Sequence, residues 1–380
     1  MCPFGPQQAR PDRGQPGMKI AVVGDGPAGL AFALSMRSLQ PDWSVQVWGR
    51  GSGSDRGYGI VLPARAVGSI ESWDPVIGES MAARGVRWSR IDVRYNGATV
   101  TSAGHEYLSI ERGQLLSAMR SRCVELGVDF RSAQIPSRAE LAADVELIVA
   151  ADGVNSVIRA QCGEELGPDL RTGRNRFLWA TAPIRLEAFT FHVFESRFGT
   201  VILHVYPYRP DRSVVIIELA SDSQAAVGEL LGEAADALGA PVEAADSDCR
   251  RFTAISLARW STANVTVIGD AAHATHFSIG SGTKMAIDDG RTLAQCLAAA
   301  PVARAQAEYE SIRRSPVAAL QQAAVASSDW LEQIDRHRHC GAEEFANRLL
   351  SRAGRPVGGD LVHVINGDVA ANRGSRLRHV

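Results

Sequence analysis

The sequence predicts an α/β fold: a Rossmann-like dinucleotide-binding domain with an inserted antiparallel β-sheet domain, completed by C-terminal helices. Three observations predict it. A short apolar run at residues 19–23 leads into a glycine-rich turn and a helical stretch, as at the start of a β-α-β unit. Between residues 173 and 252 the chain holds several runs rich in Val, Ile, Phe and Tyr, which is typical of an antiparallel sheet. After residue 285 the spacing of apolar residues becomes helical.

The elements of the first domain follow from local patterns. Residues 19–23 and 44–48 read as buried parallel strands on either side of a helix at 27–39. Pro27 suits the first turn of that helix, where a missing N–H costs nothing. A loop, a helix and another buried strand follow, at 49–59, 112–126 and 145–150.

The rest of the chain divides into a sheet and a helical end. The expected strands are 176–182, 189–194, 200–208 and 213–219, and the chain then returns to a buried strand at 265–268. Helices are expected at 286–299, 304–334 and about 345–350. We therefore expect a disordered tail at 1–17, a discontinuous nucleotide-binding domain at 18–172 and 253–335, a middle-sheet substrate domain at 173–252, and a helical or irregular segment at 336–380.

Bulk composition excludes several kinds of partner. The chain has 380 residues, 45% of them hydrophobic, and a formal net charge of −2, so we expect neither nucleic acid nor a membrane as a partner. Its six cysteines form no CxxC pair, which argues against a metal site and favours reduced thiols in the cytoplasm. No apolar run is long enough to cross a bilayer. We expect a cytoplasmic monomer or homodimer.

The glycine-rich turn marks the expected nucleotide site. Its three glycines allow a tight turn, close approach of the backbone to a pyrophosphate, and close packing of helix on strand. The following helix start presents unpaired N–H groups to the phosphates. The candidate cofactor contacts in this turn are Gly24, Gly26, Pro27, Ala28 and Gly29.

Two residues depart from the usual form of this motif. Asp25 places a carboxylate inside the phosphate turn, and Gly49 stands at the end of the second strand, where an acidic residue usually binds the ribose hydroxyls. We expect Asp25 to point to solvent. We also expect looser cofactor binding, by the roughly 0.5–1.5 kcal/mol of one lost hydrogen bond. The adjacent Arg50 is a further candidate contact.

Two later motifs also follow buried strands. The second is Ala151-Asp152-Gly153 with Ser156 and Arg159. The third is Gly269-Asp270-Ala271-Ala272-His273, which precedes a glycine-containing stretch at 276–284 and then a helix. Small residues there would let the backbone approach a ligand closely, and the helix start would stabilise negative charge on it.

Together the three motifs resemble those of the single-component (class A) FAD-dependent aromatic hydroxylases. A strand followed by Ala-Asp-Gly-x-x-Ser-x-x-Arg is similar to that family's fingerprint. A narrower resemblance covers most of residues 18–360 and points to the branch containing salicylyl-CoA 5-hydroxylase and the tryptophan-derived hydroxylase of violacein biosynthesis. It rests on residues 57–63, 173–179, 276–282 and 328–332. That branch normally has a small residue at position 25 and glutamate at position 49, so this chain departs from it at both.

The resemblance implies FAD as cofactor, NADH or NADPH as reductant, and oxygen transfer to an aromatic ring from a flavin C4a-hydroperoxide. The substrate would be an indole, aminobenzoate or phenol, free or carried as a CoA or carrier-protein thioester, in secondary metabolism. Beyond the glycine-rich turn, the implied FAD contacts are Arg112, Asp152, Asp270, Gly280, Ser281, Gly282 and Thr283.

In this family the substrate pocket lies between the flavin and the middle sheet. His204, Tyr206 and Tyr208 fall at period two and therefore share one face of the expected sheet. The catalytic candidates are His276, the best acid–base group, with Tyr206 and His204. The substrate-contact candidates are Arg65, Trp179, Tyr208 and Phe277. For each candidate the alternative to a functional role is a plain structural one, as a core or surface residue of the sheet. For Arg65 the alternative is a loop arginine in solvent.

Other functions remain open at this point. A flavin halogenase is disfavoured because the chain lacks a Trp-x-Trp-x-Ile-Pro stretch and a lysine near the ring. An oxidative decarboxylase or another flavin monooxygenase would differ only in how the substrate lies. A degenerate, non-redox binding protein with a weakened FAD site would explain Asp25 and Gly49.

Overall fold

The computed structural model describes residues 17–49, 58–131, 135–220, 225–244 and 247–354, together with the backbone of 361–366. The apolar run Lys19–Val23 forms β1 at the centre of a six-stranded sheet. The strand order is β16-β17-β9-β1-β2-β8, all parallel except β16. The other strands are β2 (Ser44–Trp48), β8 (Asp129–Arg131), β9 (Leu147–Ala150), β16 (Ser261–Thr262) and β17 (Val265–Val267).

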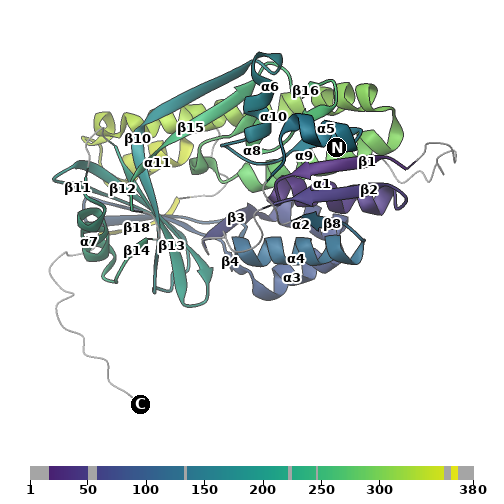
Figure 1. The fold of residues 1–380 in the computed structure, drawn as a ribbon. Coiled ribbons are helices and arrows are strands. Elements are labelled where there is room, and N and C mark those ends of the chain that lie inside the picture. Colours follow the sequence, from purple (N-terminus) through teal and green to yellow (C-terminus); the bar gives the residue numbers. More distant parts are fainter. Residues whose placement is uncertain are drawn as a thin grey trace.

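Helices pack closely against this sheet. α1 (Pro27–Leu39) follows β1, and α9 (Gly282–Ala299) lies directly on it. Gly290 of α9 makes that approach possible, because a Cβ there would lie 2.4 Å from the carbonyl oxygen of Ala28. α4 (Arg112–Glu125) also packs on α1, with α3 (Pro75–Arg84) next to α4 and α2 (Ala64–Trp73) next to α3; all three are seen below β1 and β2 in Figure 1.

A nine-stranded sheet forms the second half of the molecule. Its order is β14-β10-β13-β12-β11-β5-β6-β18, with β15 paired to β10. The strands are β5 (Ile91–Tyr95), β6 (Ala98–Ser102), β10 (Pro168–Ala182), β11 (Phe189–Ser196), β12 (Gly199–Arg209), β13 (Arg212–Leu219), β14 (Glu243–Ala244), β15 (Arg250–Leu257) and β18 (Leu361–Asn366). One face of this sheet is covered by α7 (Val227–Leu238), which buries Leu230 and Ala234.

The pairing of these strands crosses the expected division of the chain. β5 and β6 come from the first segment, and β18 from residues expected to be irregular, yet all three join the sheet assigned to residues 173–252. β10 and β15 also extend beyond that range on either side. The domain limits themselves stay a prediction, since strand pairing does not define where a domain ends.

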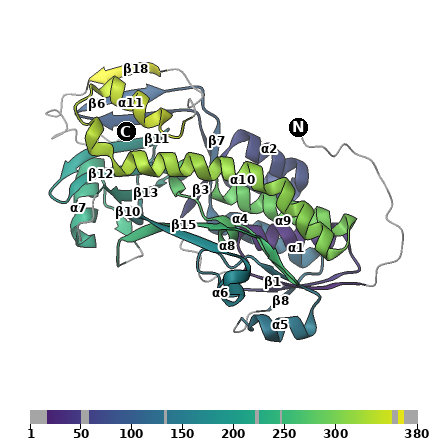
Figure 2. The ribbon, with the colours of Figure 1, turned by 90° about the horizontal axis from the view of Figure 1, so that it is seen from above.

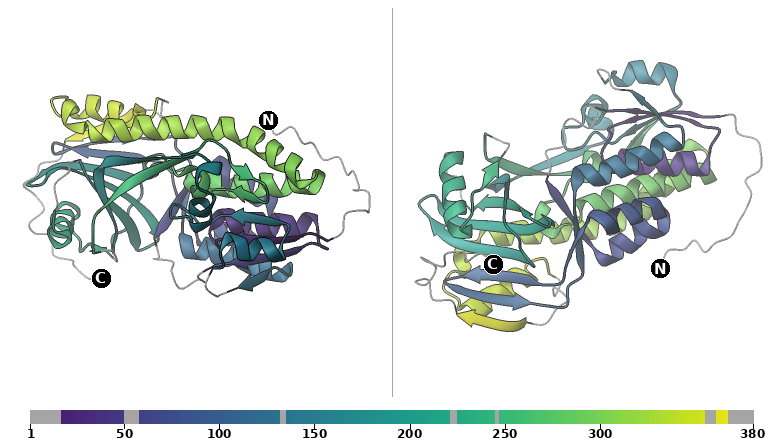
Figure 3. Two further views of the ribbon diagram at one scale, coloured as in Figure 1. Left: turned by 45° about the horizontal axis from the view of Figure 1, so that its top comes forward. Right: turned by 90° about the horizontal axis from the view of Figure 1, so that it is seen from below.

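Short elements and one long helix join the two halves. β3 (Gly59–Pro63), β4 (Val86–Trp88) and β7 (Tyr107–Glu111) form a small sheet between them. The helix α10 (Val302–Glu332) runs past both halves, as Figures 2 and 3 show. The remaining helices are α5 (Arg138–Asp144), α6 (Val157–Cys162), α8 (Asp270–His273), α11 (Ala342–Ser351) and the 3₁₀ turns η2 (Gly163–Glu165), η3 (Phe277–Ile279) and η4 (Ile334–His337). Among the described residues, none of the helices combines the length and apolarity that a membrane span requires.

Candidate active site

The glycine-rich turn has the geometry that the sequence predicts. Gly24 has φ +115°, and a Cβ on it would lie 2.2 Å from the carbonyl oxygen of Ala151. A Cβ on Gly29 would lie 2.0 Å from the oxygen of Gly24, so both positions require glycine. Gly26 differs, because the nearest atom to its Cβ would be Nη2 of Arg112, at 3.8 Å. The space over Gly26 is therefore open, and α1 begins there without a side-chain cap.

Asp25 does not point to solvent, and that expectation was wrong. Its side chain is 23% exposed and forms an ion pair with Arg120, with Nη1 3.4 Å from Oδ2. The carboxylate lies against Gly49, where a Cβ would be 2.3 Å from Cγ of Asp25. The two departures in the sequence motif are therefore neighbours in space. Arg50 lies outside the described residues.

Asp152 in the second motif uses its carboxylate to cap α6. It accepts hydrogen bonds from Ser156 Oγ at 2.5 Å and from the backbone N–H groups of Val157 and Ile158 at 2.7 and 3.3 Å. This is a structural role; its contact with the cofactor stays a prediction. Arg159, three residues after the N-cap residue Ser156, donates a hydrogen bond to the carbonyl oxygen of Ala271 in the third motif.

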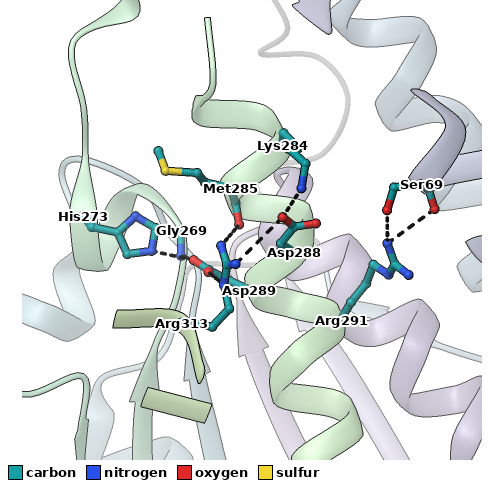
Figure 4. Close-up of polar contacts among 9 residues, drawn as sticks. All are labelled: Ser69, Gly269, His273, Lys284, Met285, Asp288, Asp289, Arg291 and Arg313. Atoms are coloured by element: carbon teal, nitrogen blue, oxygen red, sulfur yellow. Dashed lines mark hydrogen bonds and ion pairs between the residues drawn. The ribbon is translucent and has the colours of Figure 1, made fainter. Parts of the chain in front are cut away.

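The third motif is held in place by a buried charged network (Figure 4). Asp289 of α9 accepts a hydrogen bond from the backbone N–H of Gly269 at 2.9 Å and pairs with His273 at 2.6 Å and Arg313 at 2.8 Å. Burial alone would raise the pKa of Asp289, but His273 and Arg313 outweigh it and lower the pKa. Asp289 in turn raises the pKa of His273 against the effect of burial. His273 therefore has a structural role: together with Asp289 and Arg313 it holds the Gly269 turn against α9 and α10.

Asp270 and Arg112 lie next to the open space above Gly26. Asp270 is exposed to solvent, yet protein surrounds it closely enough that burial raises the pKa of its carboxyl, with His273 and Arg112 opposing. Water therefore reaches the carboxylate of Asp270 although protein lies around it. Arg112 faces both Gly26 and Asp270, so residues predicted to bind the cofactor from three parts of the chain lie together.

The segment that precedes α9 leaves polar groups without partners. Gly280 has φ +61° and ends the turn η3, and α9 then begins at Gly282 with no side-chain cap. The hydroxyl of Ser281 is buried and has no hydrogen-bond partner among the described residues. Such a helix start can hold the electron-rich edge of a ring, as the predicted contacts from Gly280 to Thr283 require. The open glycine turn, the exposed carboxylate of Asp270 and this uncapped helix fit an extended FAD.

The middle sheet presents an aromatic face toward this segment. Tyr206, Tyr208, Val214 and Ile216 form a buried cluster against which Phe177, Trp179, Phe189 and Phe277 pack. The ring of Phe277 lies 5.0 Å from Phe177, 5.6 Å from His204 and 6.1 Å from Trp179 between centroids. His204, Tyr206 and Tyr208 therefore lie on one face, as predicted from their spacing. The opposite face, with Leu203 and Val205, packs on α7.

The hydroxyl of Tyr206 is already engaged. It donates a hydrogen bond to the carbonyl oxygen of Gly59 at 2.8 Å, and burial raises its pKa far above the ordinary value. This favours an anchoring part in the fold; its predicted catalytic role is not tested by the structure. Arg65 is not a loop residue, as one alternative held, because it lies exposed in the first turn of α2.

A buried carboxylate, Glu218, was missed by the sequence analysis. It is 1% exposed, and it accepts from Asn175 Nδ2 at 2.7 Å and pairs with Nε2 of His204 at 2.9 Å. Burial opposes its charge, but His204 and His276 outweigh burial and lower the pKa of Glu218 to about 2. The signal was present, since Glu218 is the one charged residue in the apolar run 214–219.

His276 and Arg352 meet at the end of α10. Nδ1 of His276 lies 2.9 Å from Ser278 Oγ, which bonds to Ser327 Oγ at 2.7 Å. Burial lowers the pKa of His276 to about 4, with Glu218 opposing, so the ring is neutral at pH 7. Arg352 donates to Ser327 Oγ at 2.9 Å and to the carbonyl oxygen of Ser278 at 2.8 Å. No sequence signal identified Arg352, which follows an ordinary amphipathic helix.

Comparison with known proteins agrees with this geometry. A family model described as an FAD binding domain matches residues 125–324, and one described as a lycopene cyclase protein matches residues 19–172. The chain is 35% identical to 3-hydroxy-4-methyl-anthranilyl-[aryl-carrier protein] 5-monooxygenase of Streptosporangium sibiricum, over 90% of this chain and 97% of that protein. It is 31% identical to salicyloyl-CoA 5-hydroxylase of a Streptomyces species, over 88% and 70%.

Two further comparisons concern the branch and the fold. The chain is 27% identical to protodeoxyviolaceinate monooxygenase of Chromobacterium violaceum, over 88% of this chain and 94% of that protein. Among solved structures, the tetrameric form of 2-methyl-3-hydroxypyridine-5-carboxylic acid oxygenase matches with a TM-score of 0.71 at 18% identity, over 89% and 96%. At that identity the likeness concerns the fold.

The fold and the site thus define a flavoprotein monooxygenase. The chain belongs to the family of class A FAD-dependent aromatic hydroxylases, in the branch that the sequence resembles. The predictions of an enzyme, of FAD, and of oxygen transfer to an aromatic ring are confirmed. When bound, FAD would supply the oxygen-activating chemistry, with NADH or NADPH as reductant, and the protein would orient the substrate and exclude water.

Proposed function

We propose that this enzyme hydroxylates a benzenoid ring bearing a hydroxyl or amino group, and that the ring is presented as a thioester on an aryl-carrier protein or on CoA. The proposal is narrower than the family assignment, which fixes the reaction but not the substrate.

The names of two relatives support a substrate presented as a thioester. One acts on an anthranilyl group on an aryl-carrier protein, and another on salicyloyl-CoA, as their names state. Both rings carry an electron-donating group, which attack on an activated oxygen requires. This chain matches both relatives over most of their length, which supports a related substrate.

The observation that carries the proposal is the aromatic face of the middle sheet. Trp179 and Tyr208 of this face lie with Phe277 of the segment that leads into α9, next to the predicted FAD contacts from Gly280 to Thr283. Aromatic side chains stack with a flat ring in offset or edge-on arrangements and exclude water from it. An arene held there would lie between these rings and the flavin.

The polar groups beside this face suit a phenol or aniline. The neutral His276 can accept a proton from a ring hydroxyl, and Glu218 lies near enough to favour the charged form of the histidine. Arg352, which is near Tyr107 and Glu218, adds positive charge on the same side. Loss of the hydroxyl proton makes the ring more electron-rich and so promotes its oxygenation.

Location and assembly are part of the proposal. We infer a cytoplasmic enzyme, because five cysteines of the described residues are free thiols. We infer a monomer or homodimer. Size-exclusion chromatography with light scattering tests the second inference.

The experiment compares one ring in three forms. A hydroxylated aminobenzoate is supplied as the free acid, as its CoA thioester and as a carrier-protein thioester, and NAD(P)H oxidation and product mass are followed. The proposal predicts that a thioester exceeds the free acid in kcat/KM by about tenfold or more, since remote binding energy lowers the barrier. Equal rates for the free acid would refute tethering, and no hydroxylated product from any form would refute the substrate class.

A further inference from the structure

Asp25 and Gly49 are the two residues at which this chain departs from the usual FAD-binding pattern. The end of the second strand of a dinucleotide-binding unit normally supplies a carboxylate to the ribose hydroxyls. In this chain β2 ends at Trp48 and the next residue is Gly49, which has no side chain to offer. Asp25 instead supplies a carboxylate from the phosphate turn.

The two positions face each other across a very short distance. A Cβ on Gly49 would lie 2.3 Å from Cγ of Asp25 and 2.5 and 2.6 Å from its two carboxylate oxygens. The neighbouring backbones are tied together, since the N–H of Gly24 donates to the carbonyl oxygen of Trp48 at 2.7 Å. The carboxylate of Asp25 thus occupies the place where a side chain from position 49 would begin. Gly49 is required because Asp25 is there.

Arg120 holds this carboxylate from the other side. Its guanidinium lies 3.8 Å above the ring centroid of Phe130 and pairs with Oδ2 of Asp25. Among the described residues, Oδ1 accepts no hydrogen bond, and the side chain is still 23% exposed. The positive charge of Arg120 also offsets the repulsion that Asp25 would exert on a pyrophosphate. A carboxylate can accept several hydrogen bonds, so capacity remains for a ligand.

From this arrangement we propose that Asp25 binds the ribose hydroxyls of the adenosine half of FAD, in place of the acidic residue that position 49 lacks. The two departures then compensate for each other: the carboxylate that position 49 lacks is supplied by Asp25, and the FAD site is not weakened. The proposal concerns FAD binding alone and stands independently of the substrate proposed above.

The first test is the dissociation constant of FAD from the apoprotein, followed by flavin fluorescence. Asp25→Asn should weaken binding about tenfold, the value of roughly one charge-assisted hydrogen bond, while Asp42→Asn, an exposed carboxylate of the same β-α-β unit, should leave it unchanged. Melting of the two apoproteins controls for folding. An unchanged affinity in Asp25→Asn overturns the proposal.

The second test uses an FAD analogue whose adenosine is 2′,3′-dideoxy. If Asp25 contacts the ribose, the tenfold penalty of Asp25→Asn disappears with this analogue, because the lost partner is already absent. A merely structural Asp25–Arg120 pair would give the same penalty with both flavins, and that result overturns the proposal. Asp25→Ser serves as a second variant if the asparagine variant folds poorly.

The third test returns the acidic residue to position 49, where related FAD sites have it. Gly49→Glu alone should bind FAD poorly, since its Cβ collides with Asp25 and its charge repels it. The double variant Asp25→Ala/Gly49→Glu should recover to within about threefold of the wild type, as expected for coupled neighbours. A double variant no better than Gly49→Glu alone contradicts the exchange of positions.

Discussion

Arg159 of the second motif donates a hydrogen bond to the carbonyl oxygen of Ala271 in the third motif, at 2.8 Å. The same guanidinium donates to the carbonyl oxygen of Val154 at 2.6 Å. The first motif joins them, because Gly24 packs directly on the backbone of Ala151. Three segments that lie far apart in the sequence are therefore in contact, and the FAD site depends on how firmly they are held together.

Replacing Arg159 should loosen this junction. Arg159→Met removes a buried, charged donor and leaves two carbonyl oxygens without a partner, which costs about 2–4 kcal/mol of unfolding free energy. Urea unfolding measures the loss. Arg171→Met is the matched control, since the Arg171 side chain is 80% exposed and its ion pair contributes little. Equal stability of the two variants would contradict the importance of the junction.

Two alanine substitutions separate folding from cofactor binding. Gly29→Ala places a Cβ 2.0 Å from the oxygen of Gly24 and should destabilise the protein by about 3 kcal/mol or more. Gly26→Ala meets nothing closer than Arg112 at 3.8 Å, so the protein should fold but bind FAD about tenfold or more weakly. Thermal melting of the apoprotein and FAD titration distinguish the two. Tight FAD binding by Gly26→Ala would show that the pyrophosphate does not approach there.

The pair of His273 and Asp289 gives stability a predictable pH dependence. The pKa of Asp289 is lowered from about 3.8, so its contribution is present above that value and lost as the pH falls. The pKa of His273 is raised from about 6.5, so its contribution is complete below 6.5 and lost as the pH rises through the folded-state pKa. The pair therefore stabilises most between these two values.

His273→Gln measures that contribution. The difference in unfolding free energy from the wild type should be about 3 kcal/mol near pH 6 and shrink toward pH 9. Urea unfolding at a series of pH values tests it. A difference that stays constant or grows with pH would mean that His273 is not protonated in the folded protein.

His276 should act as a neutral ring throughout the working range. Since burial lowers its pKa to about 4, His276→Gln should reduce kcat/KM by the same factor, about tenfold or more, at every pH from about 5.5 to 8. His339→Gln, at an exposed histidine, should have no effect. A factor that changes through about pH 6.5 would reveal an ordinary, titrating histidine and contradict this environment.

Arg352 should matter through the segment it holds. Arg352→Met removes the donors to Ser278 and Ser327 and frees the turn that precedes α9, so hydroxylated product per NAD(P)H should fall about threefold or more while the fold persists. Arg348→Met, an exposed neighbour paired with Glu344, is the control. Unaltered coupling in Arg352→Met would show that this contact does not position the substrate.

The sequence was sufficient for the parts of the site that depend on local rules. Glycine is required at positions 24 and 29 by steric contact, and the period of two places His204 and Tyr208 on one face. The carboxyl ends of parallel strands lie at one edge of a sheet, which is why the motifs after β1 and β9 come together.

Contacts between residues that lie far apart in the sequence could not be predicted from it. Asp25 and Gly49 each looked like a defect, and only the structure shows that one occupies the room left by the other. Asp152 matched a cofactor motif, yet its carboxylate caps a helix. Arg352 reaches the site from the far end of the chain, and nothing in its local pattern marks a residue whose partners lie on α10 and the preceding turn.

The most direct test of the central claim is to follow an isotope of oxygen. The FAD-loaded enzyme is incubated with NADH or NADPH, an aminobenzoyl or hydroxybenzoyl thioester and ¹⁸O-labelled O2, and the product is analysed by mass spectrometry. One labelled oxygen atom on the aromatic ring, formed as NAD(P)H is consumed, is the result expected of an aromatic hydroxylase. NAD(P)H consumption without labelled ring product for all such substrates, or a product whose new oxygen comes from water, would contradict it.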